Sequence, residues 1–219
     1  MSRALAAVIL GAGASSRMGR PKLLLPWEGT TVIGHLVRQW GEAGAGRVTV
    51  VLRPGDGDLE TELDRIGVPP SDRIFNPEAA QGEMFSSIRC AARWPGWREE
   101  TTAWAVSLGD QPHLRTATLR GLVSFFQEHQ AHSPGGVCQP SLGGRARHPA
   151  IVPREGWRRL AEATQQTFRD FLEPERRLLW PCDDPGLSLD LDTPEDYRRF
   201  TGLAASPDAL SQNPTQEKE

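Results

Sequence analysis

The sequence predicts an α/β fold in which helices cover both faces of a doubly wound, mostly parallel sheet. Short apolar runs typical of buried strands alternate with amphipathic stretches over residues 4–130. A loop of small residues follows the first apolar run, and a loop containing an aspartate follows a later one. Both loops fall after the carboxyl ends of predicted strands, where open parallel sheets bind ligands.

Each element follows from its own pattern. Runs rich in Ala, Val, Ile and Leu predict strands at residues 4–10, 47–52 and 102–108, and "DRIF" predicts a short strand at 72–75. Apolar residues at helical spacing predict helices at residues 31–45, 58–67, 83–94 and 117–130. In the first of these helices one face carries Val32, Ile33, Leu36, Val37 and Trp40.

The last third of the chain is less regular. Residues 135–152 read as a hairpin or strand pair around a Gly-Gly turn. Helices are expected at 154–163 and 167–179, and a strand entering a helix at 187–200. Thr193 is the expected N-cap of that last helix. We therefore expect one domain over 1–202 and a disordered tail over 203–219, which has little apolar content.

Composition excludes several classes of protein. With 219 residues, 38% hydrophobic, the chain can bury one compact core, and its net charge of −3 gives no general attraction to nucleic acid or membranes. The three cysteines are far apart in sequence and show no metal-binding spacing, as expected of free thiols in the cytoplasm.

The N-terminus offers one alternative, a signal peptide. Arg3 precedes the apolar run 4–10, and small residues follow it. Seven apolar residues are at the short limit of about 7–15 for a signal peptide. A buried first strand is the preferred interpretation, because cleavage near Ala14 would remove the strand that positions the next loop.

That loop, "GAGASSRMGRPK", has the elements of a triphosphate site. Gly11 and Gly13 let backbone N–H groups approach a ligand closely. Arg17 adds a planar guanidinium and Lys22 a point charge for phosphate oxygens. The loop matches neither a dinucleotide-binding fingerprint, since Ser16 stands at the third glycine, nor the nucleotide-binding P-loop pattern. Arg53 also follows the next strand where a dinucleotide fold would have an acidic residue.

The second loop, "LGDQP", places Asp110 at the end of a buried strand. Taken alone, an aspartate this close to a proline is also common in ordinary turns that bind nothing. On the same sheet edge as a phosphate-binding loop, it becomes a candidate ligand for Mg²⁺, which prefers carboxylate and phosphate oxygens. Asp190 and Asp192 alternate with leucines and could complete the metal site.

Together these segments resemble the MobA-like NTP-transferase family. The similarity rests on "LGAGASSRMGRPKLLLP", "LGDQP" and "LDLDTPEDY", supported by "NPEAAQGEMFSSI" and "RHPAIV", and reaches to about Phe200. Within the family the motifs are most similar to those of molybdenum cofactor cytidylyltransferases. The resemblance implies a nucleotide-diphospho-sugar-transferase-like, Rossmann-like fold.

The resemblance also implies a role for each matching residue. The nucleotide would be bound by Gly11, Ala12, Gly13, Arg17, Lys22, Gly82 and Ser87. Arg17, Lys22 and Asp110 would be catalytic. Asp110 would bind Mg²⁺, with Asp192 as the second contact and Asp190 as its alternative, and His148 would face the acceptor.

The implied reaction transfers CMP from CTP, or a nucleotidyl group from another NTP, to a phosphorylated small molecule. Molybdopterin or its molybdenum-bearing form would be the acceptor, pyrophosphate would leave, and a molybdoenzyme could receive the product. Two departures concern the acceptor side: Arg147 stands where the family usually has glycine, and "TQQTFRDFL" replaces the segment G-D-x-G-A-R. A guanylyltransferase, a transferase with another acceptor and a non-catalytic nucleotide-binding protein stay open as alternatives.

Overall fold

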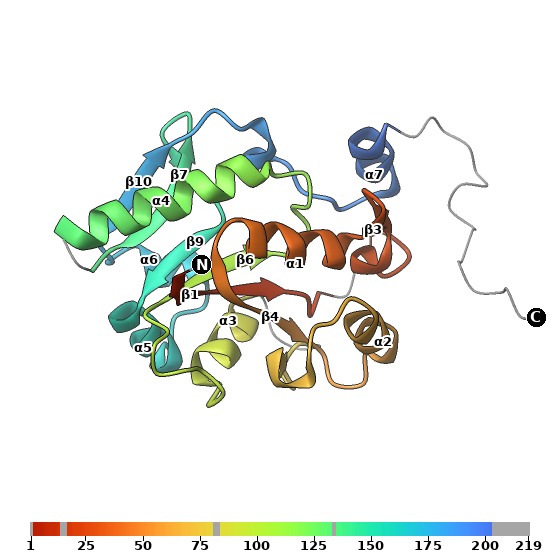
Figure 1. Ribbon diagram of the computed structural model, residues 1–219, viewed down its shortest axis with the longest axis horizontal. Coiled ribbons are helices and arrows are strands. Elements are labelled where there is room, and N and C mark those ends of the chain that lie inside the picture. The colour runs from red at the N-terminus through yellow and green to blue at the C-terminus, as the bar shows by residue number, and fades with distance from the viewer. Residues whose placement is uncertain (1, 14–16, 81–83, 133–134, 203–219) are drawn as a thin grey trace, which may run out of the picture.

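A mixed sheet forms the centre of the protein in the computed structural model, which describes residues 2–13, 17–80, 84–132 and 135–202 (Figure 1). Its strand order is β10-β7-β9-β6-β1-β4-β5, and β8 pairs with β7. The strands are β1 (Ser2–Leu10), β4 (Ala45–Leu52), β5 (Arg73–Phe75), β6 (Ala103–Leu108), β7 (Val137–Leu142), β8 (Arg145–Ala146), β9 (Ala150–Pro153) and β10 (Arg177–Pro181). The pairs β1–β4, β1–β6, β4–β5 and β7–β10 are parallel, whereas β9 runs antiparallel to β6 and β7.

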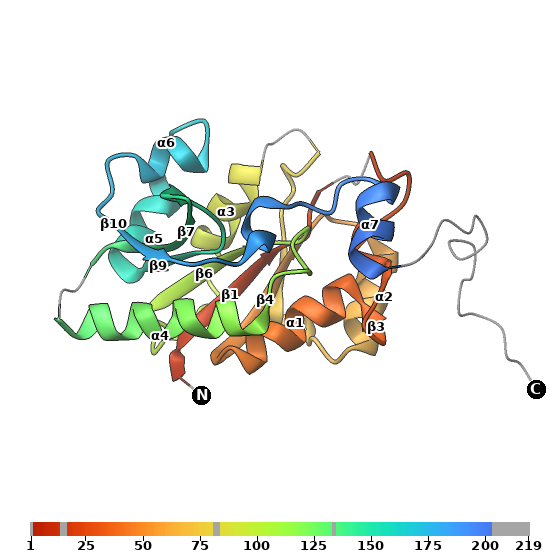
Figure 2. The same ribbon diagram turned by 90° about the horizontal axis from the view of Figure 1, so that it is seen from above.

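Helices cover both faces, which confirms the doubly wound α/β prediction (Figure 2). One core cluster contains side chains of α1 (Val32–Glu42), α2 (Gly57–Arg65), α4 (Thr116–His132) and α7 (Pro194–Thr201). The other contains side chains of α3 (Met84–Arg93), α5 (Arg154–Glu162) and α6 (Phe168–Leu172). The crossover helices α1 and α2, which lead outward from β1 to β5, therefore lie on one face, and α3, which leads back to β6, lies on the other.

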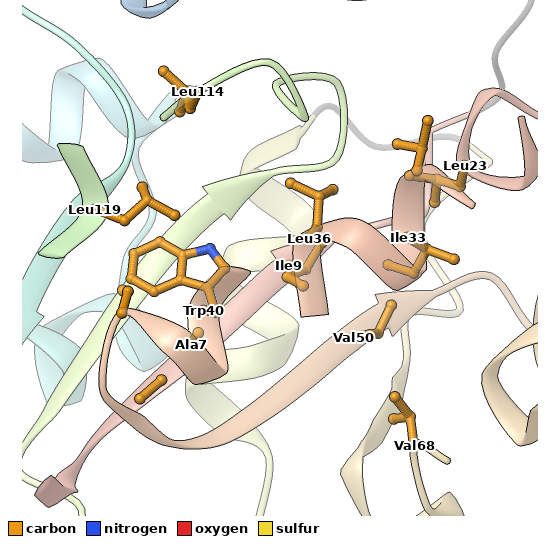
Figure 3. Packing of buried hydrophobic residues seen from close by; sticks show 14 of the residues in the cluster. Ala7, Ile9, Leu23, Ile33, Leu36, Trp40, Val50, Val68, Leu114 and Leu119 are labelled. Atoms are coloured by element: carbon orange, nitrogen blue, oxygen red, sulfur yellow. The ribbon is translucent and has the colours of Figure 1, made fainter. Parts of the chain in front are cut away.

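The central strand β1 is apolar on both faces because both faces are covered. Leu5, Ala7 and Ile9 join the first cluster, whereas Ala6 and Val8 join the second. Trp40 of α1 lies over Ala7 in the first cluster, as Figure 3 shows, and is fully buried. A continuous run of Ala, Val, Ile and Leu is what a strand buried on both sides requires.

Two sequence predictions in the last third of the chain are wrong. The helix expected at 167–179 ends at Leu172, and Arg177–Pro181 is the edge strand β10. The strand expected at the start of 187–200 is absent, because Pro185–Ser188 forms a 3-10 turn and residues 189–192 are irregular. The Gly-Gly hairpin of β7 and β8 and the Thr193 N-cap are confirmed, the latter with a full capping box to Asp196.

The cysteines and the membrane can be compared with the structure directly. All three cysteines are free, and burial raises the pKa of the Cys138 thiol to about 12. No helix within the described ranges is long and apolar enough to cross a membrane. The tail 203–219 lies outside the described residues.

A buried carboxylate, Asp184, fastens the irregular segment before α7 to the start of α4. It accepts hydrogen bonds from the Thr118 hydroxyl at 2.6 Å, the Arg115 amide at 3.1 Å and the Gly186 amide at 2.9 Å. Burial works to raise the pKa of Asp184, but these hydrogen bonds and the charge of Arg115 outweigh it and hold the pKa below its ordinary value.

We predict that Asp184→Asn lowers the free energy of unfolding by about 1–3 kcal/mol, because two buried donors lose a charged acceptor. Since the folded-state pKa is depressed, the wild-type advantage is complete at neutral pH. It disappears as the pH falls through the folded pKa of Asp184. Denaturant unfolding at several pH values measures this difference. Asp183→Asn, at the exposed neighbour, should change little, and an equal loss in both variants would refute the anchoring role.

Candidate active site

The two loops singled out in the sequence lie side by side. Leu10 of β1 pairs with Leu108 of β6 in parallel register, so the loops that follow leave the sheet at the same edge. A Cβ on Gly109 would lie 2.6 Å from the Leu10 carbonyl oxygen, a contact that only glycine avoids. Gly109 therefore lets the Asp110 loop sit directly against the first loop.

Within the first loop, the two glycines have different tasks. The Gly11 N–H donates to the Val51 carbonyl at 2.8 Å, and a Cβ there would lie 3.0 Å from that oxygen. Gly11 is thus packed against β4, and its amide serves the fold. Gly13 is exposed with nothing within 4 Å of its Cβ position, so its backbone is open to a ligand. Residues 14–16 lie outside the described residues.

A cluster of two cations and two carboxylates occupies the strand edge. The Lys22 Nζ lies 2.9 Å from Asp110 Oδ2 and 3.5 Å from Asp192 Oδ1. The Arg17 Nη2 lies 2.8 Å from Asp192 Oδ2. The Lys22 side chain is 15% exposed and that of Arg17 is 71% exposed, so the ion pair of Lys22 with Asp110 is the more buried one and that of Arg17 with Asp192 is nearer to solvent. The structure therefore brings together four residues that the sequence singled out from three distant segments.

Local structure explains the position of Lys22. Pro21 is extended, and Lys22–Leu24 forms a single 3-10 turn closed by the Leu25 amide. Leu23 is buried in this turn, which fixes the turn against the core. The ammonium is thereby held over the Asp110 loop.

Asp192 reaches the cluster because residues 186–192 pack on the loop after β6. The Leu191 amide donates to the Asp110 carbonyl at 2.7 Å, and His113 Nε2 lies 3.1 Å from the carbonyls of Gly186 and Leu189. The Gln111 amide donates to Asp190 Oδ1 at 3.0 Å. Asp190 thus accepts a hydrogen bond from Gln111, whereas Asp192 forms ion pairs with both Lys22 and Arg17.

A cavity of about 410 Å³ adjoins this cluster. It is lined by Leu10, Gly11, Ala12, Gly13, Lys22, Leu23, Ala79, Ala80, Met84, Ser87, Leu108, Gly109 and Asp110. Six of the residues expected to bind nucleotide or metal therefore line this one cavity. Gly82 lies outside the described residues.

The lining residue Ser87 is positioned by Asn76, which lies in a motif quoted above but was not singled out there. Its side-chain amide donates to the hydroxyls of Ser86 and Ser87 at 3.0 Å each, and it is 1% exposed. The signal was present in the sequence, because Asn76 directly follows the strand Arg73–Phe75. Ser87 is consequently positioned at the cavity through a buried hydrogen-bond network.

His148 directly precedes β9, the neighbour of β6 on the side away from β1, and is partly buried. Its ring centroid is 5.8 Å from that of Phe168, and its Nδ1 is buried without a hydrogen-bond partner. Burial lowers the pKa of His148, opposed by the Val106 carbonyl and the negative charge of Asp110. The neighbouring Arg147 has a buried Nε that also has no partner.

The donor set fits a hard cation held jointly with a substrate. Among the described residues, no group of three or more His, Cys, Asp or Glu side chains is arranged to hold a metal by itself. Asp110 Oδ1, however, is buried and has no hydrogen-bond partner. Mg²⁺ commonly binds one or two carboxylates and completes its shell with phosphate oxygens and water. Asp110 and Asp192 could supply those carboxylates.

Fold and site together define a nucleotide-binding α/β protein of the transferase type. The chain belongs to the MobA-like NTP transferase family, whose model matches residues 7–179. It is a nucleotidyltransferase of that family.

Relatives of similar length carry different names. The chain is 25% identical over 191 residues to the molybdenum cofactor cytidylyltransferase of Escherichia coli K12, covering 87% of this chain and 92% of the relative. It is 28% identical over 207 residues to the nicotine blue oxidoreductase of Paenarthrobacter nicotinovorans, covering 88% and 94%. The shared framework therefore does not specify one substrate.

Solved structures share the fold. A nucleotidyl transferase from Methanothermobacter superposes with a TM-score of 0.70 at 23% identity, covering 91% of this chain and 99% of that chain. The Mycobacterium tuberculosis protein Rv0371c, solved in complex with manganese, superposes with a TM-score of 0.62 at 22% identity, covering 91% and 99%. These similarities confirm the predicted nucleotide-diphospho-sugar-transferase-like architecture.

We predict that Gly109→Ala lowers the free energy of unfolding by about 1–3 kcal/mol, because the new methyl group overlaps the Leu10 carbonyl. Thermal denaturation of the purified variant measures the loss. Gly13→Ala is the matched control, since its Cβ meets nothing within 4 Å, and its midpoint should equal that of the wild type. Equal midpoints for both variants would show that the two loops do not depend on this contact.

Proposed function

We propose that the protein is a Mg²⁺-dependent cytidylyltransferase that transfers CMP from CTP to the phosphate of molybdopterin or its molybdenum-bearing form. The observation that carries the proposal is Lys22 lying between Asp110 and Asp192 at the mouth of the cavity. Anion-binding and metal-binding groups side by side are what a metal–triphosphate substrate needs. The choice of CTP and molybdopterin is supported by the sequence motifs and by the name of the Escherichia coli relative.

In the proposed reaction, an oxygen of the acceptor phosphate attacks the α-phosphorus of the nucleotide in line. The bond from that phosphorus to the oxygen bridging to the β-phosphorus breaks, and pyrophosphate leaves with the electron pair. No covalent enzyme intermediate is needed, so positioning and charge neutralisation supply the rate enhancement.

The residues of the chain divide this work. Lys22 and Arg17 would bind the phosphates, exchanging their present carboxylate partners for phosphate oxygens. Asp110 and Asp192 would hold Mg²⁺, which when bound neutralises charge developing on the phosphate oxygens. Gly13 and Ser87 line the cavity that would hold the nucleotide, and His148 would lie on the acceptor side.

The three aspartates give a graded test in a pyrophosphate-release assay. Asp110→Asn and Asp192→Asn should each lower kcat by about a hundredfold or more, because each removes charge where a metal would be held. Asp190→Asn is the matched control and should retain most activity, since Asp190 pairs with Gln111 and shares neither cation. Full activity in Asp110→Asn would exclude the proposed metal site, and equal losses in all three would point to folding damage.

The acceptor is tested by supplying purified molybdopterin with Mg²⁺ and each nucleoside triphosphate in turn. We expect pyrophosphate release only with CTP and acceptor together, and loss of release when the metal is chelated. Release with GTP instead would identify a guanylyltransferase. Nucleotide binding without release would favour a non-catalytic nucleotide-binding protein or another acceptor.

A further inference from the structure

The hairpin that precedes β9 carries an arginine whose charged end has no partner in the fold. Arg147 is half-buried, and its Nε is buried without a hydrogen-bond partner. Within the described ranges, its guanidinium forms neither a hydrogen bond nor an ion pair. The positive charge of Arg147 is therefore not compensated by any of these residues.

The backbone of Arg147, in contrast, is fixed by two hydrogen bonds to β7. Its N–H donates to the Pro140 carbonyl at 2.8 Å, and its carbonyl accepts from the Gln139 side-chain amide at 3.1 Å. Gln139 is itself 5% exposed, so this second hydrogen bond is held in the protein interior. The fold thus keeps the residue in one place and leaves its side chain unsatisfied.

Other largely buried arginines of the chain have carboxylate partners. Arg47 Nη2 lies 2.6 Å from Asp72 Oδ1, and Arg73 Nη2 lies 2.5 Å from Asp64 Oδ1. A half-buried guanidinium without an acceptor lowers the stability of the folded protein, because its donors lose water and gain nothing. The contrast indicates that the partner of Arg147 is a ligand with a negative charge.

Strand pairing places Arg147 at the rim where the proposed reaction takes place. β9 runs antiparallel to β6 with Ala150 opposite Val106, so the residues before β9 lie beside the loop that follows β6. Burial lowers the pKa of the adjacent His148, and the negative charge of Asp110 opposes this effect, as expected of a nearby carboxylate. Because β1 flanks β6 on its other side, Arg147 stands across β6 from the phosphate-binding loop.

We propose that Arg147 binds the phosphate group of the acceptor and positions it for attack. This inference rests on the proposed nucleotidyl transfer, in which an acceptor phosphate approaches a metal–triphosphate complex from the side opposite the nucleotide. Both phosphate groups are anionic and repel each other. The planar guanidinium offers two parallel N–H donors to two phosphate oxygens and offsets this repulsion. Glycine, the usual residue of the related motif at this position, cannot do so.

Calorimetric titration of the full chain with inorganic phosphate tests the binding site directly. Mg²⁺ and inorganic triphosphate are present at saturating concentration, so that Lys22 and Arg17 are already occupied. The wild type should bind phosphate, and Arg147→Gln should bind it at least about tenfold more weakly, because charge-assisted hydrogen bonds are lost. Arg147→Lys should lie between the two, since it keeps the charge but not the paired donors.

Steady-state kinetics separate positioning of the acceptor from a structural role. In pyrophosphate release with CTP and molybdopterin, Arg147→Gln should raise the KM for molybdopterin by at least about tenfold and leave the KM for CTP unchanged. Its thermal midpoint should equal or exceed that of the wild type, because the substitution removes an unpaired, half-buried charge. A structural role would lower the midpoint instead.

Arg145→Gln is the matched control, because Arg145 belongs to the same hairpin and is exposed to solvent. This variant should keep the wild-type affinity for phosphate and the wild-type KM for molybdopterin. Acetate, titrated in parallel with phosphate, compares a carboxylate with a phosphate at the same site. Tighter binding of acetate than of phosphate would overturn the assignment to a phosphate group.

The outcomes separate this inference from the proposed function. If the wild type transfers nucleotide and Arg147→Gln keeps either its phosphate affinity or its KM for molybdopterin, the inference is wrong and the proposed function stands. A lowered thermal midpoint with equal weakening for both substrates would make Arg147 structural and also refute it. If phosphate binding depends on Arg147 but no nucleoside triphosphate releases pyrophosphate with molybdopterin, the proposed function fails and the phosphate site stands. A wild type that binds no phosphate overturns the inference.

Discussion

The sharing of one ammonium group by two carboxylates organises this molecule. Lys22 comes from the loop after β1, Asp110 from the loop after β6, and Asp192 from the segment before α7. Without Lys22 the two carboxylates would repel each other across a partly buried space, and with it they lie within reach of one cation. The Arg17 guanidinium balances the remaining charge, so the four groups are neutral together.

The rest of the fold keeps these three segments in register. Parallel pairing of β1 and β6 brings two loops to one edge although they are about a hundred residues apart in the chain. Gly109 allows the two loops to touch. The hydrogen bonds from Asn76 to Ser86 and Ser87 fix the start of α3. The hydrogen bonds of Asp184 and of the Leu191 amide fix the segment before α7. Most of these contacts are backbone or buried hydrogen bonds, which define position more sharply than apolar packing does.

The sequence predicted those elements whose residue pattern fits only one kind of secondary structure. The run at 4–10 is apolar on both faces, so the strand could be predicted, and the loop with glycines and cations could be placed at the carboxyl end of that strand. The edge strand β10 was missed because "ERRLL", three charged residues followed by two leucines, fits the end of a helix as well as the start of a half-exposed strand. Residues 189–192 read as a strand by alternation, but their polar groups are satisfied by the loop after β6, a contact that no local pattern reveals. For the same reason the sequence left Asp190 and Asp192 as alternatives, which the structure distinguishes by their partners: Gln111 for Asp190, and Lys22 and Arg17 for Asp192.

The antiparallel strand β9 has a consequence for how such proteins can diverge. Because β9 runs against β6, it begins at the edge where β6 ends, so His148 and Arg147 stand beside the Asp110 loop although they come from a separate hairpin. The reversed strand β9 thus brings the residues before it to the rim where the parallel strands β1 and β6 end. Exchange of side chains between β7 and β9 can alter what lies at that rim without disturbing Lys22, Asp110 and Asp192, which come from other segments. One inherited framework can in this way serve relatives whose small-molecule chemistry differs.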